Sequence, residues 1–433
     1  MGAFSFLEAL QNEVGPRRAG TCGEQRALEW LEDRCREQGW YPERQPFRYI
    51  GSQVYRRAVN LLLIAAFLGA FFLPRWAGLL LIALVFSFVL GWRVRLELRL
   101  ARTAGENLLA GLNRPLSAYT ADAPRPPALI FCAHYDTARC VPRWLHGMTD
   151  VFRIAGPLAM LAFILYALLE LVHLGSQLLA HLAPQAEPAA RTIDSVAEWG
   201  GWVTVVLVAP LFLFMLLSTL ASLGRRQDSP GADDNGSGIA VLLELGRRLR
   251  EAPPPGVEVF LAFWGAEESG LFGSRQFVKH SGSAFSPERT ALVNVDCVGV
   301  GEYLSVYAGQ GVFRRRGTDP ASMAQLEAIC REQGVPTLRV WESIISGGSS
   351  DHAEWVDRGY RKTASLIREN YRRPSLPARV LGALLRIPYV NQMELKHIHS
   401  AKDTVEVIVP ERLEDIAVVV EQYGRQMAAE LAR

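Results

Sequence analysis

The sequence has little net charge and no closely spaced cysteines. Its 46 basic and 44 acidic residues give a formal net charge of +2 at pH 7, so the total charge does not indicate a nucleic-acid partner. The six cysteines are scattered without a CxxC pair, and we expect reduced thiols in the core rather than disulfides. The first 50 residues lack the apolar core and cleavage site of a signal peptide, so we expect none.

Hydrophobic residues are plentiful, at 49% of the 433 residues, and the mean hydropathy is +0.10. These values are high for a soluble enzyme and low for a transporter. The apolar stretches also contain almost no internal polar residues, which would make a poor transport pathway. The composition therefore predicts a soluble domain that carries a few membrane segments.

Three apolar stretches predict these membrane segments. Residues 58–92 are divided by Pro74 and its neighbours into two halves, each shorter than the roughly 20 residues of a full span, which predicts a short hairpin that crosses or dips into the bilayer. Residues 154–174 and 202–223 are long enough to cross. We therefore expect four membrane segments in two pairs, with the lipid bilayer as a partner.

An even number of segments returns the chain to the side that it left. Only Arg75 and Arg191 would lie on the far side. On the near side, close to the segments, lie Arg56, Arg57, Arg93, Arg95, Arg99, Arg102, Arg143, Arg153, Arg225 and Arg226. Because basic residues favour the cytoplasmic face, we expect the polar domain to be cytoplasmic.

The rest of the chain has the pattern of one α/β domain. Apolar spacings of three and four in residues 237–252 predict a helix. Continuous apolar runs that end in polar or acidic residues predict three strands, "ALIFCAHYDT" (128–137), "VEVFLAFWGAEESG" (257–270) and "TALVNVDCVG" (290–299). Such runs are typical of a mixed, mainly parallel central sheet covered by helices on both faces. Ligands bind at the carboxyl ends of such strands.

Polar candidates follow each of these strands. Taken singly they are weak, since Asp233 and Asp234, or Glu267 and Glu268, could simply favour the first turn of a following helix. Together, and at strand ends, they predict one polar site. The candidates are His134, Asp136, Asp234, Glu267, Glu268, Asp296 and a late histidine, His397 or His399.

The stretches around these candidates resemble the dizinc exopeptidase family, which includes bacterial aminopeptidases, aminopeptidase Y and glutamate carboxypeptidase. The matching stretches are "AHYDT", "PGADDNGSG", "WGAEESGLFGS", "VNVDCVG", "SSDHAEWVDRGY" and "IHSAKDT". The segment "GPRRAGTCGEQRALEWLEDRCREQGW" resembles the family's opening helix, and "ENLLAGL" resembles its early strand. The resemblance covers nearly all of the chain outside the apolar segments.

The resemblance implies two zinc ions per chain, bridged by Asp234. His134 and Asp296 would complete one zinc site; Glu268 and His399 would complete the other, with His397 the less favoured alternative. Asp136 would accept a hydrogen bond from the second ring nitrogen of His134 and so fix its tautomer. The resemblance also implies a cis peptide bond between Asp234 and Asn235.

The charges of this set agree with hydrolytic zinc chemistry. Three ligating carboxylates and one hydroxide balance two Zn²⁺ ions, and all ligands are nitrogen or oxygen. A water shared by two zincs has its pKa lowered toward about 7. Glu267, next to a ligand, would take the proton of that water and return it to the leaving amine. A free substrate α-amine could coordinate a zinc, which favours an aminopeptidase acting on peptides.

The chain departs from the family in several places. The apolar pairs are insertions, one before "ENLLAGL" and one between His134 and Asp234. Residues 370–391 are basic and partly apolar, and they could contact anionic lipid, cover the cleft or form an ordinary surface loop. Gly347 and Gly348 offer no side chain to stabilise an oxyanion. We expect His352 to serve the fold or the cleft wall rather than a metal.

The sequence therefore predicts a membrane-anchored zinc exopeptidase, most simply an aminopeptidase. The alternatives are a glutaminyl-cyclase-like acyltransferase with a single zinc, and a non-catalytic membrane scaffold on the same fold. The oligomeric state is not predicted. The predicted peptidase domain comprises 1–57, 93–153 and 224–433, and the membrane parts comprise the hairpin 58–92 and the pair 154–223 with its loop.

Overall fold

The structure is a computed structural model, and it divides into two compact units. Unit 1 comprises Met1–Gly51, Arg102–Val141 and Arg226–Arg433, and unit 2 comprises Ser52–Ala101 and Pro142–Arg225. The structure describes residues 2–51, 103–119, 126–142, 168–221, 227–281, 285–312, 314–343, 349–394 and 397–433, with scattered positions in 60–84 and 162–166. Unit 1 is thus assembled from three stretches of the chain, and unit 2 from the two stretches inserted between them.

A six-stranded sheet forms the centre of unit 1, in the order β1-β2-β4-β3-β5-β9. The strands are β1 (Tyr41–Tyr49), β2 (Thr103–Gly111), β3 (Ala128–His134), β4 (Glu258–Trp264), β5 (Thr290–Val295) and β9 (Thr363–Leu366). β1, β2 and β4 pair antiparallel, whereas β4, β3, β5 and β9 pair parallel. The expected mixed, mainly parallel sheet is confirmed, and the predicted strands end at or shortly before the polar residues.

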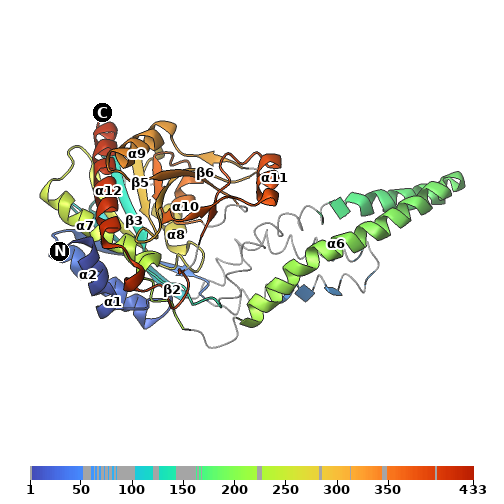
Figure 1. The fold of residues 1–433 in the computed structure, drawn as a ribbon, viewed down its shortest axis with the longest axis horizontal. Helices are drawn as coiled ribbons and strands as arrows, with labels where there is room; N and C mark the ends of the chain where they lie inside the picture. The colour runs from blue at the N-terminus through green and yellow to red at the C-terminus, as the bar shows by residue number, and fades with distance from the viewer. Residues whose placement is uncertain are drawn as a thin grey trace. The chain divides into compact units, whose positions relative to one another are not determined.

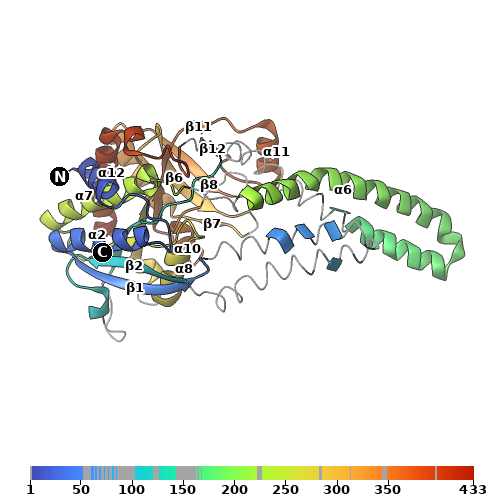
Figure 2. The same cartoon turned by 90° about the horizontal axis from the view of Figure 1, so that it is seen from below.

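Both faces of this sheet are covered, which explains why β3 is apolar throughout. Leu129 and Phe131 face one hydrophobic core, and Ile130 and Cys132 face another. Figures 1 and 2 show α7 and α12 side by side over one face. The helices of that face are α1 (Ala3–Glu13), α2 (Cys22–Glu37), α7 (Gly238–Glu251) and α12 (Pro410–Leu431). On the other face lie α8 (Phe272–Ser281) and α10 (His352–Val356).

A second, smaller sheet lies beyond β5 in the sequence. It contains β6 (Tyr303–Gln310), β7 (Arg316–Gly317), β8 (Thr337–Glu342) and β10 (Arg368–Glu369). β11 (Tyr371–Arg372) and β12 (Gln392–Met393) pair as a short ribbon. The remaining elements of unit 1 are α9 (Pro320–Glu332), α11 (Leu376–Leu384), the irregular turn η3 (Ala232–Ser237) and the short helices η1 (Leu116–Ala118), η5 (Pro287–Arg289) and η6 (Val405–Val407).

Unit 2 contains the long helix α6 (Glu187–Ala221), preceded by η2 (Pro184–Ala186) and by a helical stretch over 168–182. Among the described residues, one helix, over Pro184–Leu220, is long and apolar enough to cross a membrane. This helix begins well before the predicted segment 202–223. Residues 189–201 are too polar to be identified by hydropathy, but they contain good helix formers. Most of the predicted hairpin 58–92 and much of segment 154–174 lie outside the described residues, so the two membrane pairs stay predictions.

Candidate metal centre

The predicted ligands lie together at the carboxyl end of the central sheet. His134 is the last residue of β3, and Asp296 directly follows β5. Glu267 and Glu268 follow β4 after a short connection. Because these three strands are parallel neighbours, their ends meet at one edge, and residues far apart in the sequence come within contact distance.

Asp234 lies between two histidines and faces each with a different oxygen. Its Oδ1 is 3.3 Å from His134 Nε2, which is also 3.4 Å from Asp296 Oδ1. Its Oδ2 is 2.9 Å from His399 Nε2, which is 3.3 Å from Glu268 Oε2. Each group of three offers ligand atoms that all lie within 4.8 Å of one another.

These donor atoms fit the chemistry of zinc. Tetrahedral zinc with bonds of about 2.0–2.1 Å places neighbouring ligand atoms about 3.3 Å apart, which is close to the four distances. Imidazole nitrogen and carboxylate oxygen are also zinc ligands. In addition, Glu268 Oε1 and Asp296 Oδ1 are buried and accept no hydrogen bond within the described structure. Two adjacent groups that share Asp234 therefore suit a pair of divalent cations.

The carboxylates dominate the electrostatics of this region. Burial opposes a charge on the His134 ring, but Glu267 and Asp296 more than offset burial and raise the pKa of His134 well above its ordinary value. The pKa of His399 rises in the same way, since Glu268 and Asp234 outweigh the burial. Burial would raise the pKa of Asp234, yet hydrogen bonds with the two histidines hold it below the usual range. This edge of the sheet therefore attracts positive charge.

Asp403 holds the turn η3, which carries Asp234. Its Oδ1 accepts the backbone N–H of Asp233 at 2.7 Å, and its Oδ2 accepts that of Asp234 at 3.2 Å. On the other side of the turn, Asn235 Nδ2 donates to the carbonyl of Val295, the last residue of β5, at 2.9 Å. The peptide bond between Asp234 and Asn235 is cis, as the resemblance implied. Asp403 belongs to the sequence motif "IHSAKDT", whose pattern predicts no role for this residue.

Arg17 supports the same turn from the N-terminal segment. Its guanidinium is fully buried and donates to the carbonyls of Gly231 at 2.7 Å and Pro230 at 3.1 Å. Burial lowers the pKa of Arg17 to about 10, although Asp403, Asp234 and other acids oppose this shift. Arg17 thus remains a cation next to the carboxylates. The sequence offered only the motif "GPRRAGT" as a signal for this residue.

Asp136 lies where we expected it but binds different atoms. The ring Nδ1 of His134 is 3.1 Å from the backbone oxygen of Asp136 and 3.8 Å from its carboxylate, so the predicted hydrogen bond to the carboxylate is wrong. The carboxylate instead accepts the backbone N–H groups of Glu267 at 2.9 Å and Glu268 at 3.2 Å. The backbone turn after β3 brings a carbonyl to the ring and leaves the carboxylate free for the neighbouring loop.

Glu267, the predicted proton shuttle, follows a strained residue. Ala266 has a positive φ of 54°, which is uncommon for a residue other than glycine and occurs often at functional sites. Glu267 itself is half-buried. Burial raises the pKa of its carboxyl well above the ordinary value; the His134 charge opposes this rise, and Glu268 and Asp351 add to it. This environment suits a group that takes up and releases a proton.

The two late histidines lie in different places. His399 joins Asp234 and Glu268, as predicted, whereas His397 Nε2 is 2.8 Å from Asp233 Oδ2 and lies near Glu369. That distance is an ordinary hydrogen bond, and the other oxygen of Asp233 accepts the N–H of Gly299 at 2.7 Å. Asp233 therefore braces the turn by hydrogen bonds.

His352 is fully buried, as expected of a residue that serves the fold. Its ring packs edge-on against Tyr307 and its Nε2 lies 3.1 Å from Glu342 Oε1. The preceding Ser350 accepts a hydrogen bond at 2.9 Å from Asn294 of β5. Gly347 and Gly348, which have no side chain to stabilise an oxyanion, lie outside the described residues.

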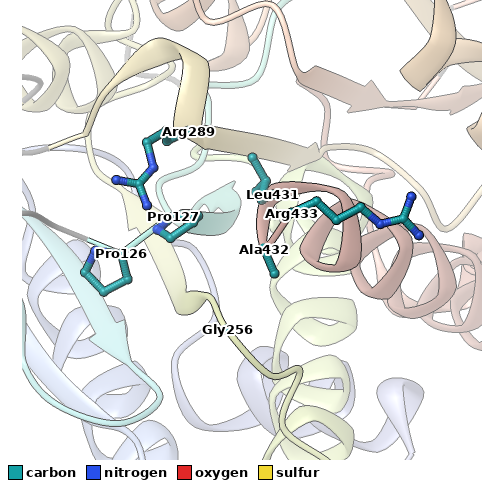
Figure 3. A pocket seen from close by; sticks show the side chains of 7 residues that line it. All are labelled: Pro126, Pro127, Gly256, Arg289, Leu431, Ala432 and Arg433. Atoms are coloured by element: carbon teal, nitrogen blue, oxygen red, sulfur yellow. The ribbon is translucent and has the colours of Figure 1, made fainter.

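A cavity of about 560 Å³ lies at the opposite end of the strands. It is lined by Pro126, Pro127, Gly256, Arg289, Leu431, Ala432 and Arg433. Pro127 and Gly256 precede β3 and β4, so this cavity is at their amino ends, whereas His134 is at the carboxyl end. Figure 3 shows the side chains of Arg289 and Arg433 pointing in different directions. The cavity is separate from the candidate metal centre.

Sequence comparisons match the part of the chain that contains most of these residues. The model of peptidase family M28 matches residues 215–424, which include Asp234, Glu268, Asp296 and His399 but not His134. Aminopeptidase YwaD of Bacillus subtilis is 35% identical over 137 residues, covering 30% of this chain and 27% of the relative. Probable lipoprotein aminopeptidase LpqL of Mycobacterium tuberculosis is 48% identical over 90 residues, covering 21% and 16%. The alignments thus span about a quarter or less of these relatives.

Solved structures share the fold over nearly the whole chain. The zinc aminopeptidase BSAP from Bacillus subtilis matches with a TM-score of 0.51 and 16% identity, covering 97% of this chain and 93% of its own. A glutaminyl cyclase from an Acidobacteriales bacterium matches with a TM-score of 0.53 and 13% identity, covering 99% and 94%. These likenesses show the shared fold, and the sequence matches confirm the resemblance to peptidase family M28.

Proposed function

We propose that the protein is a zinc-dependent aminopeptidase with two metal ions per chain. The observation that supports this most directly is the position of Asp234, whose two oxygens face two different histidines. One group would consist of His134, Asp234 and Asp296, and the other of Asp234, Glu268 and His399. The family match and the named aminopeptidase relatives favour peptide hydrolysis as the reaction.

When bound, zinc lowers the pKa of coordinated water and polarises a substrate carbonyl. Glu267 would accept the proton of an attacking water and donate it to the leaving amine; its position next to a proposed ligand and its raised pKa support this role. Asp136 holds Glu267 and Glu268 through their backbone N–H groups. The residues thus divide into those that hold the metal and one that moves a proton.

The test uses the full chain purified in detergent. We expect about two zinc ions per chain, because a carboxylate bridge joins two metals. We also expect hydrolysis of aminoacyl anilides with a free α-amine. Matched substrates with a blocked amine should be cleaved poorly. Cleavage of the blocked substrates alone would contradict an aminopeptidase, and retention of a single zinc would contradict the bridging role of Asp234.

The same panel addresses cyclase activity, because a glutaminyl cyclase shares the fold at a TM-score of 0.53. Peptides with an N-terminal glutamine would then lose ammonia and form a ring without any cleavage of the peptide bond. We expect hydrolysis instead, since ligands for two cations lie together. Cyclisation without hydrolysis would replace our proposal with the acyltransferase.

Membrane anchoring forms a second part of the proposal. Only 18% of the most apolar 18-residue stretch of the helix over Pro184–Leu220 is buried. Trp199, Trp202 and Val206 of α6 are at least 60% exposed. A helix that exposes so many apolar side chains is better solvated by lipid than by water. The arginines near the apolar segments favour a cytoplasmic position for unit 1.

The side of the membrane can be tested with Cys22, the exposed cysteine of unit 1. A membrane-impermeant maleimide should label Cys22 in inverted vesicles of an expressing bacterium but not in its intact spheroplasts. The Cys22→Ser variant is the control for labelling elsewhere. Labelling in intact spheroplasts would place unit 1 on the outer face.

A further inference from the structure

The segment 370–393, here called the arm, leaves the body of unit 1 and returns to it. Its two ends pair as β11 and β12, and α11 lies between them. Asn391 Nδ2 donates to the carbonyl of Arg339 at 2.7 Å, and Arg315 donates to the carbonyl of Leu385 at 2.6 Å. These bonds fix the arm to the small sheet. Figures 1 and 2 show α11 at the periphery of unit 1.

The helix α11 exposes its apolar side chains in an ordered pattern. Leu376 is 68% exposed, Val380 51% and Leu384 72%, and these three residues, here called the apolar stripe, recur every fourth position. Residues at this spacing lie along one face of a helix. The opposite face is buried through Ala378 and Leu381. The helix is therefore packed on one side and presents a second apolar face to its surroundings.

The charged residues within the arm are all basic. Residues 370–393 contain four arginines and no acidic residue, and all four are exposed, namely Arg372, Arg373, Arg379 and Arg386. Two further exposed arginines, Arg314 and Arg315, belong to the loop that reaches the end of α11. A short apolar helix face flanked by cations is the pattern that binds the interface of a membrane with anionic lipids.

We propose that the arm docks on an anionic lipid bilayer, with the apolar stripe inserted among the acyl chains and the arginines at the headgroups. This surface is distinct from the candidate metal centre and does not depend on the peptidase activity. Each arginine near an anionic surface changes binding by about fivefold, so loss of several should abolish the preference for anionic lipid. Salt should weaken the interaction by screening.

The test uses the full chain in nanodiscs of phosphatidylcholine, with and without phosphatidylglycerol. A phospholipid with a photoreactive acyl chain labels residues that enter the bilayer, and amide hydrogen exchange reports on α11. We expect lipid labelling of residues 376–384 and slower amide exchange there. With phosphatidylglycerol, the labelling should rise and the exchange should slow further, each by about fivefold or more. A chain that enters neither nanodisc, or α11 labelled equally in both, would overturn the proposal.

Three variants separate the contributions. The substitutions Leu376→Gln, Val380→Gln and Leu384→Gln together keep good helix formers and the buried face, and they should remove labelling of α11. Arg373→Gln, Arg379→Gln and Arg386→Gln together should remove the dependence on phosphatidylglycerol. Tyr41→Ser, at a 46% exposed residue of β1, is the matched control and should change nothing. Cross-links between the α11 helices of two chains in place of lipid adducts would identify the stripe as a dimer face and contradict lipid docking.

Discussion

The carboxylate of Asp136 accepts the backbone N–H of Glu267 at 2.9 Å, which ties the end of β3 to the loop after β4. The substitution Asp136→Asn replaces one acceptor oxygen with an amide that would face an N–H group, so the loop must shift. Residues that orient metal ligands typically contribute about 10–100-fold to metal affinity or activity. We expect a loss of that size in turnover or in zinc affinity, measured by steady-state kinetics and by competition with a chelator. Unchanged values for both would show that Asp136 does not position the loop.

Glu267 and Glu268 are neighbours, but the same substitution should affect turnover at one and zinc binding at the other. Glu267→Gln should retain zinc and lose about 10²–10⁴-fold in turnover, because it removes the proposed base and leaves the ligands in place. Glu268→Gln should weaken metal binding, because it removes the charge of a proposed ligand that lies 3.3 Å from His399. Zinc content and turnover are measured on both purified variants. Joint loss of zinc and turnover in Glu267→Gln would identify Glu267 as a ligand.

The parts of this site that could be predicted from the sequence are those that depend on local pattern. Continuous apolar runs determined where β3, β4 and β5 lie, because a strand buried on both faces has no polar alternation. The polar residues at the strand ends, together with the family resemblance, then indicated His134, Asp234 and Glu268, and the structure brings these residues together.

The supporting contacts could not be predicted, because they join segments without any local signal. Asp403 binds the backbone N–H of Asp233, 170 residues away, and Arg17 reaches the carbonyl of Gly231 across 214 residues. The partner of the His134 ring was missed for a related reason. A turn of the backbone decides whether a carbonyl or a carboxylate meets the ring, and residue types alone do not specify that turn.

Arg17 and Arg18 are adjacent arginines that should differ greatly in their effect on stability. Arg17 is fully buried and donates to carbonyls of the turn before Asp234, so Arg17→Met leaves buried acceptors without donors and should cost at least about 2 kcal/mol. Arg18 forms an ion pair with Asp228 in which both side chains are 28% exposed, and Arg18→Met should cost less than about 1 kcal/mol. Urea unfolding in detergent, followed by tryptophan fluorescence, compares the two. Equal losses would show that the buried hydrogen bonds of Arg17 add nothing.

Glu24 should make the stability of unit 1 depend on pH near neutrality. Its Oε2 accepts the N–H of Gly20 at 2.7 Å at the start of α2, and its Oε1 is buried without a hydrogen bond in the described structure. Burial raises the pKa of Glu24 from 4.5 to about 7; the Gly20 hydrogen bond opposes this rise, and Glu106 adds to it. The folded protein thus binds a proton that the unfolded chain has released between these two pH values.

The sign of the effect follows from this difference. An acid whose pKa is higher in the folded state gives its full stabilisation below pH 4.5, and that stabilisation is lost as the pH rises through about 7. The loss can reach about 3 kcal/mol, since one pKa unit corresponds to about 1.36 kcal/mol. The Gln side chain of the Glu24→Gln variant cannot ionise. The unfolding free energy of the wild type should therefore fall relative to that of the variant as the pH rises over this range. Urea unfolding at several pH values and constant ionic strength measures that difference. A difference that does not change with pH would show that Glu24 titrates alike in the folded and unfolded states.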